Sequence, residues 1–296
     1  MAQSSCGGCG RSAIPRRESF DVGRVGYNGL METIGFGTEL RRWRGSRRVS
    51  QLELANRAGT TQRHLSFIER GRSMPGRAII VRLAEALGLS LRERNALLLR
   101  AGYAPLFPES GLDEPMLRPV RDALEGILDG HLPCPALVLR PYGEVVAANS
   151  AIDVLTEDAD PALLDVPVNM LRLMLHPDGM ARRVRNLADW GQHVIENLRR
   201  HAGRSPDPRL DEFIAELSGY VPTATPGSDH MGFAVPLRLR CHDGELQLLT
   251  TLTSFATAVD ITLAELHLEA FLPADEMTAE ILRTRARARS DATRLG

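Results

Sequence analysis

The segment AGTTQRHLSFIERGRS, residues 58–73, brings together side chains that suit nucleic-acid binding. Gln62 offers an amide and Arg63 a guanidinium, and each can bond two atoms of one base edge at once, adenine for glutamine and guanine for arginine. Arg70 and Arg72 follow, and guanidinium groups there suit phosphate contacts, which position a protein on a duplex without reading its sequence. A solvated charge is the alternative interpretation for each outward arginine.

These side chains need a helix that points them outward, and the apolar residues among them predict one. Leu65 and Ile68 lie three residues apart and anchor the helix inward. Gly59 can supply the left-handed backbone of a tight turn before it. The side chains left on the outward side are then Thr61, Gln62, Arg63, His64, Ser66 and Phe67. Among these, Thr61 and Phe67 can offer a methyl group or a ring face to thymine.

The flanking sequence predicts four more short helices and, with them, an all-α helix-turn-helix domain over residues 35–104. An apolar face at residues 36–43 marks the first helix. The pairs Ser50–Glu53 and Ser90–Glu93 are capping boxes that open the second and fifth helices. Gly88 closes the fourth. Five short helices with a tight turn between the second and third are typical of a helix-turn-helix bundle.

The distribution of charge favours a polyanionic partner for this part of the chain. The whole chain has a formal net charge of −1. Residues 1–105 nevertheless carry 18 Arg and 8 acidic residues, a net of +10, whereas residues 106–296 carry 18 Arg and 29 acidic residues, a net of −11. The chain contains no lysine. We therefore expect the N-terminal third, and not the remainder, to meet a polyanion.

The run SQLELANRAGTTQRHLSFIERGRS, residues 50–73, resembles the DNA-binding segment of the XRE family, and the resemblance covers residues 36–104. It implies that Gln51 holds a phosphate at the N-terminus of the second helix and that Arg44 and Glu69 pair across the domain. It also implies a homodimer that binds double-stranded DNA at a two-fold operator, with half-sites about one helical turn apart. A helical bundle without a DNA role is the alternative.

After a Pro- and Gly-rich linker at residues 105–115, the sequence predicts an α+β domain over residues 116–285. An amphipathic helix at residues 116–128 is followed by two strands within residues 135–155. A helical stretch runs from about Leu163 to Leu217. Three antiparallel strands then follow, at residues 233–240, 246–255 and 263–272. This order is that of a PAS-like domain with an antiparallel sheet, and the linker makes independently moving domains the default.

Three further runs resemble the ligand-binding domain of the MmyB-like regulators: PALVLRPYGEVVAANSA, NMLRLMLHPDGMARRVRNLADW and VDITLAELHLEAFLPADEMT. The resemblance covers most of residues 110–285. It implies that the domain senses a small molecule, with fatty acids among the ligands proposed for the family, in a pocket between sheet and helices.

Four residues are candidates for that ligand site: Asn149, Arg172, His176 and Trp190. Arg172 lies between apolar neighbours and could anchor a ligand carboxylate, or it could bridge to an acidic residue within the fold. Each of the others also has a structural alternative. Asn149 could cap a helix, His176 could cap a turn, and Trp190 could belong to the core.

Other functions find little support in the sequence. Cys6 and Cys9 form a C-x-x-C without the second ligand pair that a zinc site needs, and we assign them to a flexible arm at residues 1–34. Four cysteines in 296 residues make no disulfide framework. No apolar run is long enough to span a membrane. We therefore expect a cytoplasmic protein without metal or cofactor, ending in a C-terminal tail at residues 286–296.

No catalytic elbow, metalloprotease motif or phosphate-binding loop is present, which argues against an enzyme. Two alternatives stay open for the C-terminal domain. It could be a dimerisation module without a ligand, or a small-molecule enzyme domain tethered to DNA.

Overall fold

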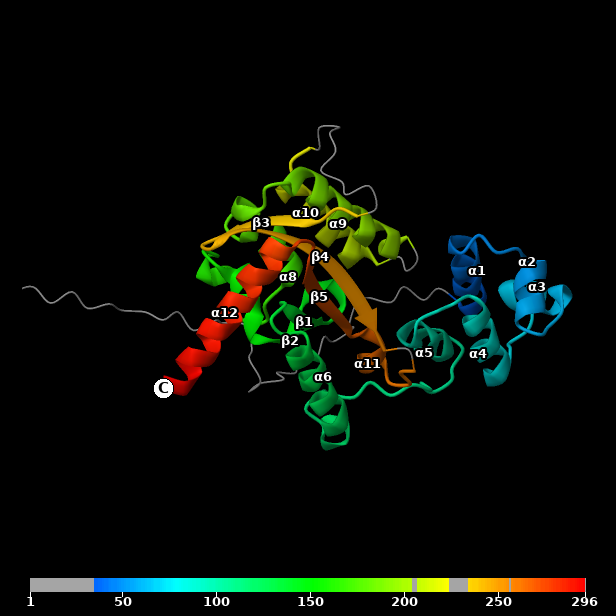
Figure 1. The fold of residues 1–296 in the computed structure, drawn as a ribbon. Helices are drawn as coiled ribbons and strands as arrows, with labels where there is room; N and C mark the ends of the chain where they lie inside the picture. The colour runs from blue at the N-terminus through cyan, green and yellow to red at the C-terminus, as the bar shows by residue number, and fades with distance from the viewer. Residues whose placement is uncertain (1–34, 204–206, 224–233, 256, 296) are drawn as a thin grey trace, which may run out of the picture.

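The computed structural model describes residues 35–203, 207–223, 234–255 and 257–295 (Figure 1). The proposed arm at residues 1–34, with Cys6 and Cys9, lies outside them. The described chain contains an α-helical N-terminal part and a C-terminal part in which helices cover an antiparallel sheet. This confirms the predicted fold class.

The N-terminal part consists of five short helices: α1 (Phe36–Ser46), α2 (Gln51–Arg57), α3 (Gln62–Glu69), α4 (Arg77–Ala86) and α5 (Leu91–Arg100). Local signals set their ends. The Ser50 hydroxyl accepts a hydrogen bond from the Glu53 N–H at 3.1 Å, and Ser90 forms a complete capping box with Glu93. Gly59 has φ +63° in the turn between α2 and α3, a backbone conformation that favours glycine.

The bundle closes around an apolar core to which every helix contributes, and α1 and α3 cross at very short range there. The crossing point is Gly37. A Cβ atom added to Gly37 would lie 2.4 Å from the carbonyl oxygen of Ile68 and 2.9 Å from that of Glu69. Since both neighbours are backbone atoms of α3, no side-chain rotation can make room. Glycine at position 37 therefore sets how closely α3 approaches the rest of the domain.

The C-terminal part is built on a five-stranded antiparallel sheet with strand order β2-β1-β5-β4-β3. Its strands are β1 (Ala136–Leu139), β2 (Val145–Ala148), β3 (Leu237–Cys241), β4 (Gly244–Ser254) and β5 (His267–Pro273). The helices that flank it are α6 (Arg118–Gly130), α7 (Asp153–Thr156), α8 (Met170–Leu175), α9 (Leu187–Ala202), α10 (Pro208–Tyr220), α11 (Ile261–Glu265) and α12 (Glu276–Leu295).

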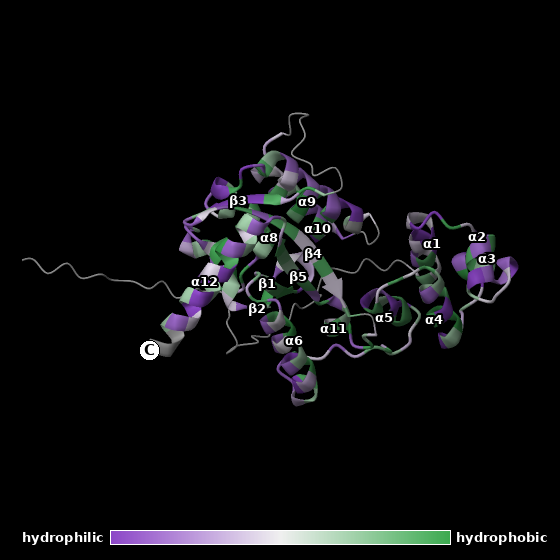
Figure 2. Cartoon of the chain, viewed as in Figure 1, coloured by the Kyte–Doolittle hydropathy of each residue, from purple (hydrophilic) through white to green (hydrophobic). Residues whose placement is uncertain are grey.

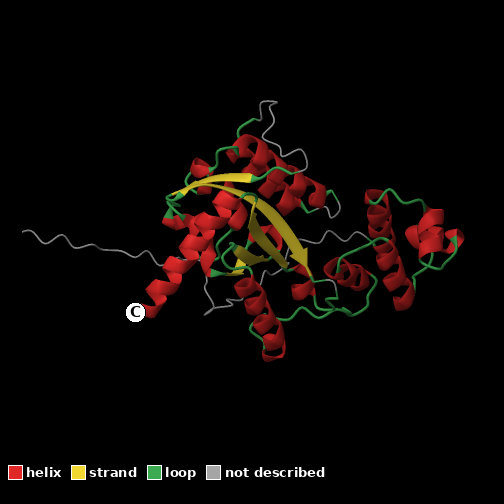
Figure 3. Cartoon of the chain, viewed as in Figure 1, coloured by secondary structure: helices red, strands yellow, loops and turns green. Residues whose placement is uncertain are grey.

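Alternate side chains of the strands feed two separate cores, one on each face of the sheet. The strands lie among helices (Figure 3). The larger core joins Leu137 and Phe271 to side chains of α8, α9, α10 and α12, and we call this side the inner face. The smaller core joins Val138 and Ala270 to α6 and α11. The two strands, helices and three strands expected from the sequence are therefore present in the predicted order.

The helical stretch predicted from about Leu163 to Leu217 contains three separate helices, α8, α9 and α10. Asn169 caps α8 through the N–H of Arg172, and a turn follows the helix. Within that turn, a Cβ atom on Gly179 would lie 2.2 Å from the Leu173 carbonyl oxygen. The chain thus folds back on α8 there, a tertiary contact that apolar spacing does not reveal.

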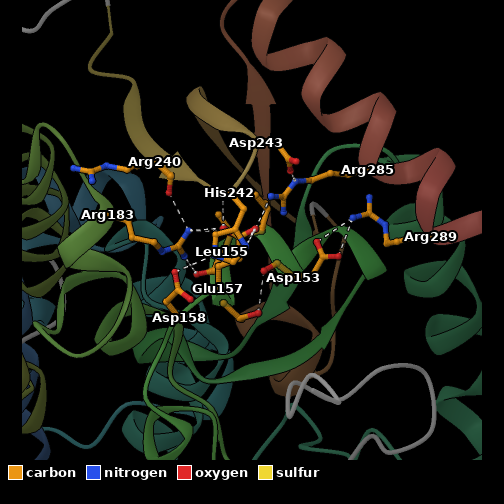
Figure 4. Close-up of polar contacts among 12 residues, drawn as sticks. Asp153, Leu155, Glu157, Asp158, Arg183, Arg240, His242, Asp243, Arg285 and Arg289 are labelled. Carbon is orange, nitrogen blue, oxygen red and sulfur yellow. Dashed lines mark hydrogen bonds and ion pairs between the residues drawn. The ribbon is translucent and has the colours of Figure 1, made fainter. Parts of the chain in front are cut away.

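Two predicted boundaries near the C-terminus also need correction. The strand expected at residues 263–272 begins only at His267, since residues 261–265 form α11, which the Asp260 side chain caps. The expected tail is helical, because α12 continues to Leu295. Arg285 of α12 pairs with Glu157, and Arg289 pairs with Asp153 at 2.9 Å, so this helix is tied to both ends of α7 (Figure 4).

The linker at residues 105–115 is bound to the helical domain. The buried Asn95 side chain accepts hydrogen bonds from the N–H groups of Leu106 at 2.8 Å and Phe107 at 3.1 Å. Its amide also donates to the Phe107 carbonyl at 2.7 Å. One side chain of α5 therefore fixes the start of the linker with three hydrogen bonds.

The same linker is bound to the sheet domain a few residues later. The Asp260 carboxylate accepts from the Ser110 N–H at 3.1 Å, and the Thr262 hydroxyl donates to the Ser110 carbonyl at 2.8 Å. Leu112 is buried in the smaller core. Independently moving domains were the expectation from composition, and these contacts contradict it.

The Gly37 crossing yields the first prediction. Gly37→Ala should destabilise the helical domain by about 1–3 kcal/mol, because the added methyl group overlaps the backbone of α3. Gly45→Ala is the matched control on the same helix, since a Cβ there meets nothing within 4 Å; it should be neutral or stabilise by up to about 1 kcal/mol. Urea unfolding of the full chain measures both, and equal effects of the two substitutions would contradict the crossing geometry.

Candidate functional site

The outward surface of α3 carries the residues proposed to read DNA. Thr61, Gln62 and Arg63 are exposed at its start, while Leu65 and Ile68 are buried beneath. Hydrophilic residues predominate on this helix (Figure 2). The Thr61 hydroxyl accepts from the His64 N–H at 3.1 Å, so it caps the helix while the residue stays exposed. The structure thus brings the predicted residues onto one surface of the domain.

The side chain of Phe67 holds two of the proposed DNA contacts in place. The guanidinium carbons of Arg63 and Arg70 each lie 5.5 Å from the centre of its ring, within the range of a cation–π interaction. The Nε of Arg70 also donates to the Ser66 carbonyl at 3.0 Å. This stacking restricts both arginines before any DNA arrives, which lowers the entropy that binding must remove. The half-buried Phe67 therefore positions Arg63 and Arg70. Its predicted contact with thymine stays a prediction.

The His64 ring lies against the turn that precedes the helix. Its Nδ1 is 2.9 Å from the Thr60 hydroxyl oxygen. This contact leaves the half-buried ring attached to the domain rather than extended into solvent. Arg72, beyond the end of the helix, is exposed, as a phosphate contact requires.

A buried carboxylate at the end of α3 collects three side chains of the first two helices. The Glu69 side chain is fully buried. Arg44 donates to both of its oxygens, at 2.6 and 3.0 Å, and Gln51 donates at 2.8 Å. The Nε of Arg41 lies 3.6 Å away. Arg44 and Glu69 thus lie where the family resemblance placed them.

The Gln51 amide nitrogen is part of this cluster, which bears on its expected phosphate contact. Burial alone would raise the pKa of Glu69, but the hydrogen bonds from Arg44 and Gln51 and the arginine charges hold it below its ordinary value. A phosphate contact by Gln51 is then left to the second hydrogen of its amide nitrogen or to its backbone N–H at the start of α2.

Two of the candidate ligand residues have structural roles. The Asn149 side chain is buried and bonds to four backbone groups, accepting from the N–H groups of Ala136 and Ala151 and donating to the carbonyls of Leu128 and Cys134. Its hydrogen-bonding capacity is therefore filled within the fold, as its capping alternative requires. Trp190 is buried in the larger core. The geometry therefore leaves Asn149 no free group for a ligand.

Arg172 and His176 lie together at the outer end of α8 and bond to other parts of the fold. Arg172 donates to both carboxylate oxygens of Glu216 at 2.6 and 2.8 Å, which holds the pKa of Glu216 below its ordinary value. The His176 Nδ1 accepts from the Asp178 N–H at 3.0 Å, and its ring packs edge-on against Tyr220. Two roles were considered for Arg172: an anchor for a ligand carboxylate and an ion pair within the fold. The structure shows the ion pair.

Glu269 is a candidate that the sequence analysis missed. It lies on β5, opposite Leu137 of β1 and Leu252 of β4, and therefore faces the larger core. It is 9% exposed, and burial raises the pKa of its carboxyl group to about 7. The alternation in LHLEAFL contained the signal, because Glu269 occupies an inward position with Phe271.

A second feature outside the predicted site joins the two domains. Arg92 of α5 donates to both Glu265 oxygens of α11, at 2.7 and 2.8 Å, and to Glu109 of the linker at 2.6 Å. Beside this bridge lies a cleft of about 240 Å³ bordered by Ser90, Arg94 and Ala264. We call the three charged residues the interdomain bridge.

The described residues contain neither a candidate membrane span nor a cluster of potential metal ligands. No helix in that part of the chain is both long and apolar enough to cross a lipid bilayer. Nor do three or more His, Cys, Asp or Glu side chains gather there as a potential metal site.

Two family models match the chain. One, described as MmyB-like transcription regulator ligand binding domain, matches residues 120–284. The other, described as a helix-turn-helix domain, matches residues 36–97. No curated protein matches the chain.

The chain is also similar to several solved structures. The restriction-modification controller protein C.AhdI from Aeromonas hydrophila is 32% identical over 21% of this chain and 94% of its own, with a TM-score of 0.20. The clp gene regulator ClgR from C. glutamicum is 27% identical over 25% and 92%, with a TM-score of 0.21. An RNA-binding light-oxygen-voltage receptor is 15% identical over 88% and 65%, with a TM-score of 0.25.

The Glu69 cluster gives the second prediction. Glu69→Ala should destabilise the helical domain by about 3–5 kcal/mol, because it leaves Arg44 largely buried without its charge partner. The control is Glu53→Ala, which breaks the exposed pair with Arg57 and should cost no more than about 0.5 kcal/mol. Urea unfolding at neutral pH measures both.

Acidification provides an independent check of the same cluster. Since the folded pKa of Glu69 is depressed, its contribution is present above the unfolded carboxyl's value of 4.5 and is lost as pH falls through the folded pKa. Wild type should therefore lose more stability in acid than Glu69→Gln does. Parallel pH profiles for the two proteins would contradict the buried pair.

Proposed function

The chain belongs to the family of the MmyB-like transcription regulator ligand binding domain, and we propose that it regulates transcription by coupling a small-molecule signal to sequence-specific DNA binding. It is a helix-turn-helix DNA-binding transcription regulator. What remains to be proposed is which residues read the operator, what the ligand is, and how the two domains communicate.

One observation carries the DNA-reading part of the proposal. The outward surface of α3 presents Gln62 and Arg63 together, with Phe67 stacked between Arg63 and Arg70. This arrangement suits a helix whose first residues contact base edges in the major groove while later residues hold the backbone. We propose base contacts for Gln62 and Arg63, with Thr61, His64 and Phe67 beside them. Gln51, Arg70 and Arg72 would contact phosphates, and the operator would be two-fold and bound by a homodimer.

We propose that the C-terminal domain binds a small amphipathic molecule at the inner face of its sheet. A fatty acid is the candidate that the family resemblance implies. Arg172 does not suit the role of an anchor for the fatty-acid carboxylate, since its guanidinium forms a bidentate pair with Glu216. The polar group that recognises the ligand must then come from elsewhere on that face.

Communication between the domains can follow the interdomain bridge. Arg92 belongs to α5 of the DNA-binding domain, and Glu265 ends α11, which leads directly into β5. The linker adds fixed hydrogen bonds to both sides. A ligand that binds two arrangements of β5 and α11 unequally would thus change the position of α5. This route works within one chain and does not depend on a dimer.

Two alternatives make different predictions for the C-terminal domain. A domain that only dimerises would carry no small molecule through purification, and an enzyme domain would convert the molecule that co-purifies. Native mass spectrometry of protein from its own host distinguishes the sensor from a domain that only dimerises. A turnover assay on the co-purified molecule distinguishes the sensor from an enzyme. The proposed sensor releases its ligand unchanged.

The third prediction concerns DNA reading. Arg63→Ala should relax discrimination at one or two base pairs, by about 1–3 kcal/mol for each lost bidentate contact. Arg72→Ala should instead weaken binding to all sequences alike and flatten the salt dependence. Selection of sites from random DNA measures the first effect, and titrations at several salt concentrations measure the second. An unchanged consensus after Arg63→Ala would rule out its base contact.

The fourth prediction concerns the interdomain bridge. In the full chain, Arg92→Ala should keep operator affinity near wild type without ligand but should reduce the change in affinity that the co-purifying molecule causes. That change should amount to about 1–3 kcal/mol in wild type. Arg283→Ala, which removes an exposed arginine of α12, is the control and should leave the response intact. If Arg92→Ala responds as fully as wild type, the bridge is not the route of coupling.

A further inference from the structure

Glu269 occupies the middle of the sheet. It belongs to β5, which lies between β1 and β4, and its direct neighbours on the inner face are Leu137 and Leu252. Phe271, two residues on, is fully buried on the same face. An ionisable side chain thus stands among apolar ones on the face that the larger core covers.

The carboxyl group of Glu269 has no hydrogen-bond or ion-pair partner among the described residues, although the residue is only 9% exposed. This distinguishes it from Glu69, whose oxygens accept from Arg44 and Gln51. A buried carboxyl group without a partner costs stability, since it loses water without gaining a replacement. Apolar residues of similar size would be less costly at this position, so packing does not account for a glutamate there.

The sheet next to Glu269 is open. In the first half of β4, Leu246 and Leu248 are fully buried on the inner face, but the second half, residues 250–254, is exposed. Leu252, the direct neighbour of Glu269, is 57% exposed. Figure 1 shows this end of β4 running toward α11. One apolar side chain that reaches solvent, Leu252, therefore lies directly beside the carboxyl group.

We propose that Glu269 is the polar anchor of the ligand site and that it selects a ligand with a protonated amine on an apolar body. The amine would bond to the Glu269 carboxylate, and the apolar body would cover Leu252. This inference rests on the proposed ligand-sensing function and specifies the chemistry of its ligand. A carboxylate ligand would place a second acid beside the first, and the arginine expected to hold it pairs with Glu216 instead.

The state of the carboxyl group gives this site a pH dependence. Burial alone raises the pKa of Glu269 to about 7, with no charged side chain contributing. On its own strand, His267 faces the same side two residues earlier, and the neighbours on β1 and β4 are leucines. A cationic ligand binds the ionised carboxylate, so binding releases a proton and weakens as pH falls below 7.

The experiment compares three eight-carbon probes that differ only in the head group: octylamine, octanoate and octan-1-ol. Each is titrated into the full chain by calorimetry at pH 8 and pH 6, for wild type, Glu269→Gln and the control Glu280→Gln. Glu280 is an exposed residue of α12. The melting temperature of each unliganded variant checks its folding, and Glu269→Gln should melt no lower than wild type at pH 8 because it removes an unpaired buried charge.

We expect octylamine to bind wild type and Glu280→Gln at least about tenfold more tightly than the other probes, and Glu269→Gln to lose about tenfold in octylamine affinity. Between pH 8 and pH 6, the ionised fraction of a group with pKa about 7 falls about tenfold. Octylamine affinity in wild type should fall similarly. The change in octylamine affinity between pH 8 and pH 6 in Glu269→Gln reports any effect of His267. The effect of Glu269 is therefore the difference between this change and that of wild type.

Equal octylamine affinity in wild type and Glu269→Gln, tighter binding of octanoate, or binding of none of the probes would each overturn the inference. Failure of the proposed function has a different signature. It would leave operator affinity unchanged by the molecule that co-purifies with the native protein, whatever the head-group preference at Glu269.

Discussion

Glu69 ends α3 with its carboxylate fully buried, and Arg44, Gln51 and Arg41 of the first two helices converge on it. A buried acid is stable only when its oxygens are satisfied, so the three donors and the acid must keep one arrangement. This arrangement fixes the direction of α3 relative to α1, and the crossing at Gly37 fixes their separation. The residues proposed to read DNA begin the same helix and inherit their position from this cluster.

Glu269 presents the opposite condition in the other domain. Glu269 is 9% exposed, yet its carboxyl group has no hydrogen-bond or ion-pair partner in the described chain. A satisfied buried acid makes a structure rigid, whereas an unsatisfied one stores a cost that a ligand can remove. The two acids thus fit the two tasks that we propose for the chain. Glu69 would fix the position of the DNA-reading helix, and Glu269 would respond to a bound ligand.

Local signals explain why the helical domain could be predicted closely. Ser50 and Ser90 cap their helices, and Gly59 adopts the left-handed conformation expected of it, through contacts within a few residues. The order of strands and helices along the sheet domain was predicted, but the ends of its helices were not. The turn at Gly179 and the pairing of Arg289 with Asp153 depend on residues distant in sequence. Periodicity contains no information on such contacts, so neither the breaks within the helical stretch nor the attachment of the C-terminal tail could be predicted.

The linker is the most consequential example of a feature that the sequence did not predict. Its composition suggests that the two domains move independently, but its hydrogen bonds attach it to both. Proline and glycine lower the cost of an irregular path, but they do not decide whether that path is bound to its surroundings. Asn95 bonds three backbone groups of the linker, and Asp260 bonds another on the far side. Asp260 also caps α11, the helix that carries Glu265 and continues into β5. The strand that holds Glu269 is therefore connected to the DNA-binding domain through one capping carboxylate and one arginine bridge. A displacement at the inner face of the sheet has a short path of direct contacts to α5. Under the proposed function, a change in affinity for DNA requires only that the two ends of this path prefer different arrangements.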